Sequence, residues 1–213
     1  MTLVCFAVKE EAGAFQRLAR GKIGVSTMVT GMGRRNAETA IRDFLAACPT
    51  DVVFTCGFAG GLHPDLAPGA VVFATADTEL ADKLQAAGAK PATFHCATTV
   101  AVTAADKQQL RATTGADVVE MESEAIQTVC RERGIPCATI RVISDTAREN
   151  LPLDFNQLYR PDMSLDFGKL LWAIVRSPGK ISGLLRLQKR CQFAAGELAA
   201  VLIKVLPIAD ENR

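Results

Sequence analysis

Short runs of apolar, β-forming residues recur along this chain, and most are followed by a polar or glycine-rich turn and then by helical spacing. A continuous apolar run of this length is typical of a strand covered on both faces, as strands of parallel sheets are. The apolar runs cover residues 3–8, 24–30, 51–57, 70–75 and 137–144. Helical spacing covers residues 10–18, 36–47, 78–90 and 122–133, whereas 94–102 reads as extended and 58–69 as a loop.

The alternation of strands with helices predicts the α/β fold class, with a mostly parallel mixed central sheet flanked by helices. At 213 residues the chain is long enough for one well-buried domain and too short for two comfortable ones. It contains no internal repeat, low-complexity tract or domain linker. We therefore expect a single domain over residues 1–213, in which residues 150–213 form a helical C-terminal extension.

Charge and cysteine usage exclude several classes of function. The formal net charge of +1 provides no overall attraction to nucleic acid or to an anionic membrane. The seven cysteines form no CxxC pair and no ligand-like spacing with the two histidines, so we expect reduced core cysteines and no metal site. The N-terminus lacks the basic start of a signal peptide, and no apolar stretch could span a membrane, so we expect a cytoplasmic protein.

Polar or glycine-rich sequence follows five of the predicted strands. These strand ends carry Glu10–Glu11, TGMG at 30–33, GFAGG at 57–61, EMES at 120–123 and Ser144–Asp145. In α/β sheets, ligands bind at the carboxyl ends of the strands. The convergence of these segments on one edge therefore predicts a ligand site there.

Two of these segments are rich in glycine. TGMGRRNA at 30–37 could direct backbone N–H groups toward an anion, with a simple tight turn as the alternative and Arg34 at the surface. It matches neither the dinucleotide nor the P-loop pattern. CGFAGGL at 56–62 lets the backbone approach a bound group closely, and the alternative is a loop that requires positive φ.

The acidic strand ends each have a structural and a functional interpretation. Glu10 and Glu11 suit a helix start because of the helix dipole, although a carboxylate there could also activate a water. The pair Glu120 and Glu122 either caps the next helix or holds a polar group.

Asp145, which follows Ser144, has the same two interpretations. Its sequence context favours a helix N-cap, because Asp and Ser accept N–H bonds ahead of a helix. The alternative is a carboxylic acid at the edge of a pocket, whose pKa burial would raise so that it could donate a proton.

Taken together, AVKEEA, TGMGRRNA, CGFAGGL, VVEMESEAI and RVISD resemble the purine and uridine phosphorylase superfamily, which includes the methylthioadenosine/S-adenosylhomocysteine nucleosidases. The match runs from residue 3 to about 147, and its last two motifs are the specific part. The resemblance implies an enzyme that cleaves an N-ribosidic bond without a metal or redox cofactor.

By position, the resemblance assigns roles to individual residues. Glu122 would bind the ribose hydroxyls, and Met121 would pack against the sugar. Asp145, oriented by Ser144, would protonate or hydrogen-bond N7 of the purine. The chemistry fits, because a nearby carboxylate and a leaving-group acid both lower the barrier through an oxocarbenium-like transition state. The residues that would lie beside the base and sugar are Gly57, Phe58, Ala59 and Gly60.

The nucleophile stays open between water and inorganic phosphate. Glu11 occupies the position of the glutamate that activates water in the nucleosidases. A phosphorylase instead needs donors around phosphate, which Thr30, Gly31, Gly33 and Arg34 could supply in part. The chain departs from the nucleosidases in two places. Arg148 stands where they commonly have a second aspartate, and the segment 74–118 is shorter than the corresponding segment in those enzymes.

The C-terminal residues resemble those of the hopanoid-biosynthesis-associated phosphorylases, which are associated with removing adenine from adenosylhopane. The resemblance implies a purine nucleoside substrate, here lipid-linked, and a homo-oligomer. Residues 167–196 contain six lysines and arginines and no acidic residue, beside apolar helical faces. Such helices either contact an anionic membrane surface or pack on the sheet or a second subunit. Two alternatives remain: a methylthioadenosine/S-adenosylhomocysteine nucleosidase and a non-catalytic nucleoside-binding module.

Overall fold

The computed structural model describes residues 1–160, 162–164, 166–206 and 209–210. Its strands are β1 (Thr2–Phe6), β2 (Lys22–Ile23), β3 (Val25–Val29), β4 (Val52–Gly61), β5 (Val71–Thr75), β6 (Lys90–Pro91), β7 (Phe94–Cys96), β8 (Val118–Glu120), β9 (Cys137–Asp145) and β10 (Ala209–Asp210). Its helices are α1 (Lys9–Leu18), α2 (Arg34–Ala47), α3 (Thr78–Ala86), α4 (Ala104–Thr114), α5 (Ser123–Glu132), α6 (Phe167–Arg176) and α7 (Ile181–Val205), with short 3₁₀ helices η1 (Phe155–Gln157) and η2 (Pro178–Lys180).

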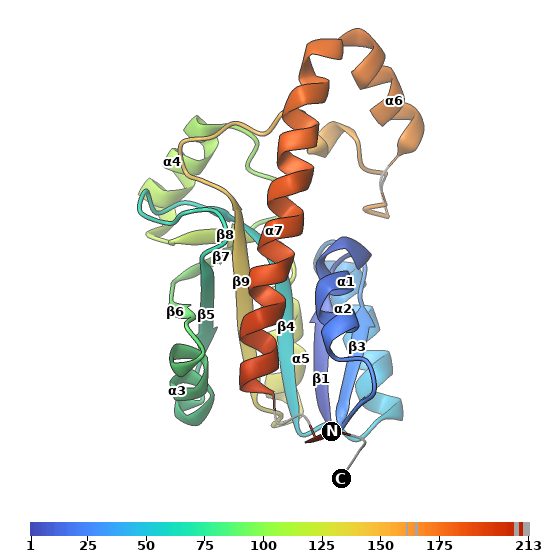
Figure 1. Ribbon diagram of the computed structural model, residues 1–213, viewed down its shortest axis with the longest axis vertical. Helices are drawn as coiled ribbons and strands as arrows, with labels where there is room; N and C mark the ends of the chain where they lie inside the picture. The colour runs from blue at the N-terminus through green and yellow to red at the C-terminus, as the bar shows by residue number, and fades with distance from the viewer. Residues whose placement is uncertain (161, 165, 207–208, 211–213) are drawn as a thin grey trace.

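One mixed sheet organises the molecule (Figure 1). Its strands lie in the order β3-β1-β4-β9-β5-β6, with β8 beside the end of β4 and β7 beside β8. The central strands β3, β1, β4 and β9 are parallel, whereas β5 is antiparallel to β9 and β8 is antiparallel to β4. The predicted α/β class, with a mostly parallel sheet flanked by helices, is confirmed.

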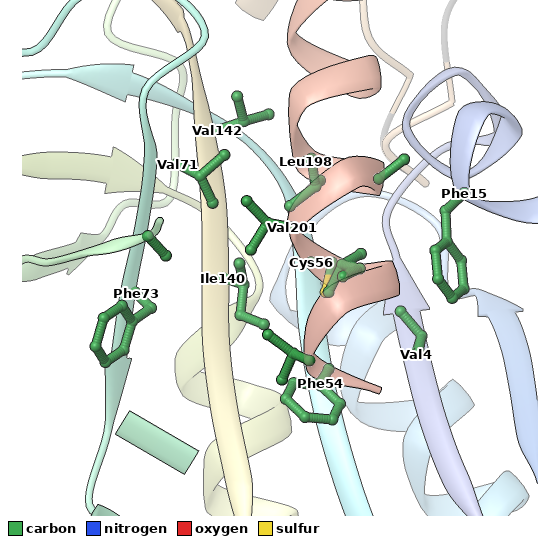
Figure 2. Packing of buried hydrophobic residues seen from close by; sticks show 14 of the residues in the cluster. Val4, Phe15, Phe54, Cys56, Val71, Phe73, Ile140, Val142, Leu198 and Val201 are labelled. Carbon is green, nitrogen blue, oxygen red and sulfur yellow. The ribbon is translucent and has the colours of Figure 1, made fainter. Parts of the chain in front are cut away.

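Helices cover both faces of this sheet. α2 and α5 pack on one face, while α1, α3 and α7 pack on the other. Figure 2 shows the second layer, in which Phe15 of α1 and Leu198 of α7 lie over Val4 and Ile140 of the strands. The apolar residues of α7 recur at helical spacing from Ala194 to Val205, which places this stripe against the sheet.

β4 is longer than the sequence predicts. It continues to Gly61, so the predicted loop over 58–69 is wrong for its first four residues. β9 pairs with β4 as far as Gly60, and β8 pairs with Gly60 and Gly61 on the other edge. These hydrogen bonds on both sides outweigh the low strand propensity of glycine.

Helix α4 has no counterpart among the predicted helices. The prediction of an extended segment over 94–102 is correct only for β7. A capping box begins α4: Thr103 Oγ1 accepts the Asp106 N–H at 3.1 Å, and Asp106 accepts the Thr103 N–H at 2.9 Å. The spacing of Thr103 and Asp106 in the sequence was the signal for this helix.

The C-terminal helices divide into two parts. The second half of α7 is buried against the sheet, α1 and α3. Its first half extends past the carboxyl edge of the sheet, where η2 joins it to α6 (Figure 1). Leu171, Trp172 and Val175 of α6 are 56–70% exposed.

Candidate active site

Four acidic side chains are buried at one edge of the sheet: Glu11, Glu120, Glu122 and Asp145. Glu11 lies in the first turn of α1, Glu120 ends β8, Glu122 precedes α5 and Asp145 ends β9. Burying an unpaired carboxylate is costly, so each needs nearby donors or a proton. Their partners therefore decide what each of them can do.

Glu11 connects the start of α1 to β4. Its Oε2 accepts the N–H groups of Ala7 and Val8 at 2.9 and 3.2 Å, and its Oε1 accepts that of Phe58 at 2.7 Å. A Cβ atom at Gly57 would lie 2.6 Å from Oε1, so glycine is needed there. Burial raises the pKa of Glu11 to about 7, against the opposing hydrogen bond from Phe58. A carboxylate that exchanges its proton near pH 7 suits a general base.

Glu120 closes the start of α5. It accepts the N–H groups of Glu122 and Ser123 at 3.0 and 2.8 Å, the Ser123 hydroxyl at 2.7 Å, and Arg141 Nη2 at 2.7 Å. Burial alone would raise the pKa of Glu120, but Arg141 and these hydrogen bonds outweigh it, and the pKa is lowered. Of the two glutamates in EMES, this one is the helix cap.

Glu122 turns instead toward the loop after β3. Its Oε1 accepts the Gly33 N–H at 2.8 Å. Burial raises the pKa of Glu122, while the charge of Arg141 and the Gly33 N–H oppose that shift. Met121 is buried and lines, with Gly33 and Cys96, a cavity of about 500 Å³. Glu122 and Met121 therefore lie next to the glycine-rich loop after β3, and their contacts with a sugar stay a prediction.

Asp145 ends β9, and the chain then turns without starting a helix. The predicted N-cap is therefore wrong, because no N–H groups of a following helix need its carboxylate. Asp145 Oδ1 accepts the Ser144 hydroxyl at 2.6 Å, and that hydroxyl also lies 3.4 Å from the Ala59 carbonyl. A Cβ atom at Gly60 would lie 3.4 Å from Asp145 Oδ2. Ser144, Ala59 and Gly60 thus surround this carboxylate.

Lys107 of α4 is a partner that the sequence did not reveal. Its side chain is fully buried, and its Nζ forms an ion pair with Asp145 Oδ2. The same ammonium donates to the Thr146 and Glu149 carbonyls at 2.8 and 3.0 Å. A lysine in a helical segment normally lies in solvent, so no local pattern could indicate this contact.

The charges of these carboxylates act on two residues of the C-terminal extension. Burial, followed by the charges of Glu122 and Glu11, raises the pKa of Tyr159 to about 12. Burial, followed by the charges of Asp145 and Glu11, raises the pKa of Cys191 to about 11. Glu11 binds the Phe58 N–H and Asp145 pairs with Gly60, so both carboxylates lie at the carboxyl end of β4.

The glycine-rich loop after β3 contributes one direct contact to this group, through Gly33. Gly31 and Gly33 both have φ of 83°, which makes this a turn that favours glycine. Thr30 Oγ1 donates to the Gly31 carbonyl at 2.9 Å. Arg34 pairs with Glu124 at 3.2 Å in an exposed position, and it also lines the cavity of about 500 Å³ that Gly33 and Met121 line.

Within the described part of the chain, no group of three or more His, Cys, Asp or Glu side chains is arranged to hold a metal ion. Nor does any helix among the described residues have the length and apolar character needed to cross a membrane.

Solved structures resemble this chain over nearly its whole length. Methylthioadenosine/S-adenosylhomocysteine nucleosidase from Helicobacter pylori, solved with butyl-thio-DADMe-Immucillin-A, has 15% identity and a TM-score of 0.73, covering 96% of each chain. Futalosine hydrolase from Helicobacter pylori has 16% identity and a TM-score of 0.69, covering 95% of this chain and 97% of its own. The Neisseria meningitidis nucleosidase, solved with methylthio-immucillin-A, has 18% identity and a TM-score of 0.71, covering 96% and 97%. They share the fold.

The sequence also matches a protein family, the phosphorylase superfamily, over residues 5–95 and 73–176. These two matches together span most of the 213 residues. The predicted family is confirmed, and so is the predicted enzyme class of nucleoside phosphorylases and nucleosidases. The chain belongs to the phosphorylase superfamily.

Proposed function

We propose that this protein cleaves the N-glycosidic bond of an adenosyl nucleoside and releases adenine. The observation that carries the proposal is the placement of three buried carboxylates at one edge of the sheet. Glu11 binds Phe58 of β4, Asp145 pairs with Gly60 of β4, and Glu122 follows β8, which pairs with the end of β4. A related nucleosidase from Helicobacter pylori has been solved with 5′-methylthioadenosine in its active site. The similarity of its fold to that of this chain supports an adenosyl nucleoside as the substrate.

In this proposal Glu122 binds the ribose hydroxyls, because its buried carboxylate lies beside the apolar Met121 and the Gly33 N–H. Its negative charge would stabilise the positive sugar of the transition state. Asp145, held by Ser144, faces N7 of the purine. Phe58 and its neighbours in β4 lie along the base and sugar.

The electrostatics around Glu11 favour water as the nucleophile. With its pKa raised to about 7, Glu11 can take a proton from water near neutral pH. The candidate phosphate ligands are largely engaged within the protein, since the Gly33 N–H binds Glu122 and Arg34 pairs with Glu124. We therefore propose hydrolysis, with phosphorolysis by inorganic phosphate as the alternative.

The substrate that we favour carries a large apolar 5′ substituent, as adenosylhopane does in hopanoid biosynthesis. A cavity of about 620 Å³ between α6 and the segment before it is lined in part by the apolar residues Leu153, Leu158 and Trp172. Its other walls are largely polar or charged and include Asp154, Lys169 and Arg176. Leu158 precedes Tyr159, whose pKa is raised by burial and then by the charges of Glu122 and Glu11. An apolar tail that extends from the ribose could therefore reach this cavity.

Adenine release decides among these functions. We would incubate the protein with methylthioadenosine and with an adenosine bearing a long apolar 5′ substituent, each with and without phosphate. We expect adenine without phosphate and a kcat/KM for the apolar substrate at least about tenfold higher. A preference for methylthioadenosine would indicate the nucleosidase alternative. Binding without adenine release would indicate a non-catalytic module and contradict the proposal.

We further propose that α6 and the start of α7 contact an anionic membrane, because exposed apolar and basic side chains occur together there. Leu171, Trp172 and Val175 are exposed, and the Arg176 guanidinium lies 3.5 Å from the centre of the Trp172 ring. Residues 167–196 carry basic charge without any acidic residue, which complements anionic lipid. Such a surface would hold the enzyme where a lipid-linked nucleoside resides.

Sedimentation with phosphatidylcholine vesicles, with and without phosphatidylglycerol, tests the membrane contact. Binding should require phosphatidylglycerol, weaken with salt, and fall at least about tenfold in Val175→Ser. Leu18→Ser, at an exposed leucine of α1, is the matched control and should bind as the wild type does. Light scattering on both variants measures their oligomeric state and so tests the predicted homo-oligomer. A change of oligomeric state in Val175→Ser without lipid binding would assign this surface to a second copy and contradict membrane contact.

A further inference from the structure

We infer that Lys107 is a positioning residue that supplies, through Asp145, the proton taken up by the departing adenine. This inference rests on the proposed function and deepens its leaving-group step. The observation that carries it is the buried ion pair between Lys107 of α4 and Asp145 at the end of β9.

Both oxygens of Asp145 already accept from donors. Oδ1 receives the Ser144 hydroxyl and Oδ2 receives the Lys107 ammonium. An ion-paired carboxylate has no proton of its own to give, and N7 of a purine is itself an acceptor. A proton for N7 must therefore enter Asp145 from a neighbour. The ammonium is the acidic group within hydrogen-bond distance.

The position of Lys107 is fixed by all three of its N–H bonds. Besides Asp145, the ammonium donates to the Thr146 and Glu149 carbonyls. The Glu149 side chain holds this turn in place, because it accepts the Thr146 N–H at 3.0 Å and pairs with Arg190 at 2.5 Å. Lys107 thus faces Asp145 with no donor left for a substrate, and it must act through that carboxylate.

The pair is also shielded from water. Lys107 has no exposed surface, and Asp145 is only 6% exposed. Val119 and Gly60 close the pair on the β4 side, where a Cβ atom at Gly60 would lie 3.9 Å from Lys107 Cε. In such surroundings either charge is costly without its partner, which keeps the ammonium and the carboxylate in contact.

The proposed step balances as follows. The C1′–N9 bond breaks, and its electron pair goes to the purine. N7 takes a proton from Asp145 as Asp145 takes one from Lys107, so adenine leaves neutral and the lysine is left as an amine. Water attacks C1′ and gives its proton to Glu11. Once adenine has left, Glu11 releases that proton to solvent and solvent returns one to Lys107, so every group regains its starting state. The overall reaction consumes one water and needs no other reactant.

The test compares two leaving groups in the variant Lys107→Met. One substrate is the adenosyl nucleoside, and the other is the corresponding 4-nitrophenyl riboside, whose leaving group departs without a proton. We expect kcat for adenine release to fall about 10²–10⁴-fold with KM little changed, and nitrophenol release to fall less than tenfold. Asp145→Asn should show the same selectivity. Equal losses on both substrates, or no loss, would overturn the inference.

A double variant separates this role from folding. Lys107→Met combined with Asp145→Asn leaves no unpaired buried charge, so it should fold even where a single variant does not. If the two residues form one proton route, the double variant should release adenine no more slowly than Asp145→Asn alone. An additional loss of tenfold or more would contradict the inference.

Arg111→Met provides the matched control on the same helix. Arg111 pairs with Asp117 at 3.1 Å and makes no contact with Asp145 among the described hydrogen bonds. Its variant should keep both activities. The wild type tests the proposed function separately: failure to release adenine from any purine nucleoside refutes that function, whereas wild-type release unaffected by Lys107→Met refutes only the proton route.

Discussion

Glu11 and Glu120 are two carboxylates with nearly the same burial and opposite electrostatics. They are 6% and 5% exposed. Glu120 contacts Arg141 and the hydroxyl of Ser123, and its pKa is lowered. Glu11 receives backbone N–H groups alone as direct donors in the described structure, and burial raises its pKa to about 7. Burial therefore does not set the state of a carboxylate, whereas a cation in contact with it does.

This difference separates a structural residue from a functional candidate. Glu120 gives α5 its cap and Arg141 its counter-charge, so it remains ionised and stabilises the fold. Glu11 lacks full compensation, which makes its proton available near neutral pH. Mutations at the two positions should therefore affect different properties of the protein.

The largest effect on stability should come from Glu120→Gln. It removes the charge that compensates Arg141, which is 2% exposed. Leaving a buried cation unpaired should lower the free energy of unfolding by about 3–5 kcal/mol. Urea denaturation followed by circular dichroism measures this loss. A change below about 1 kcal/mol would mean that Arg141 finds another partner, and the contrast with Glu11 would fail.

Glu11 should instead make stability depend on pH. Its pKa is raised from 4.5 to about 7 in the folded protein, so between these values the folded state holds a proton that the unfolded state has lost. Its contribution to stability should therefore fall as pH rises through this window, by up to about 3 kcal/mol. Above pH 7 the same residue is ionised and hydrolysis should reach its plateau.

Glu11→Gln isolates this contribution. Relative to the wild type, its free energy of unfolding should vary less between pH 4.5 and 7, while adenine release should drop about 10²-fold or more. Urea denaturation across this pH range and an adenine assay give both quantities. An unchanged pH dependence would show that another group titrates there.

Gly57→Ala should produce the smallest change in stability and should still affect Glu11. The new Cβ atom would meet Glu11 Oε1 at 2.6 Å, so the carboxylate must move. We expect a loss of about 1–3 kcal/mol and a lower rate of adenine release. Gly196→Ala, in α7 with open space at its Cβ position, is the control and should be neutral or slightly stabilising. Equal behaviour of the two variants would contradict the close contact at Gly57.

The sequence predicted features that depend on residues close together in the chain. The order of strands and helices, the glycine-rich turn after β3 and the family followed from local patterns. The pair Glu120 and Glu122 was recognised, but its division into a cap and a candidate ligand required the hydrogen bonds. The N-cap prediction for Asp145 failed because the residues after it turn instead of forming a helix.

Sequence alone determined the α/β class, the family and the acidic positions at the strand ends, because periodicity and motif spacing are local properties. Tertiary structure alone decided the partners of those acids. Lys107 reaches Asp145 across 38 residues, Gly33 donates to Glu122 across 89 residues, and Phe58 binds Glu11 across 47 residues. Charge interactions depend on distance in space and on exclusion of water. The protonation states that would perform the chemistry are therefore set only once the chain is folded.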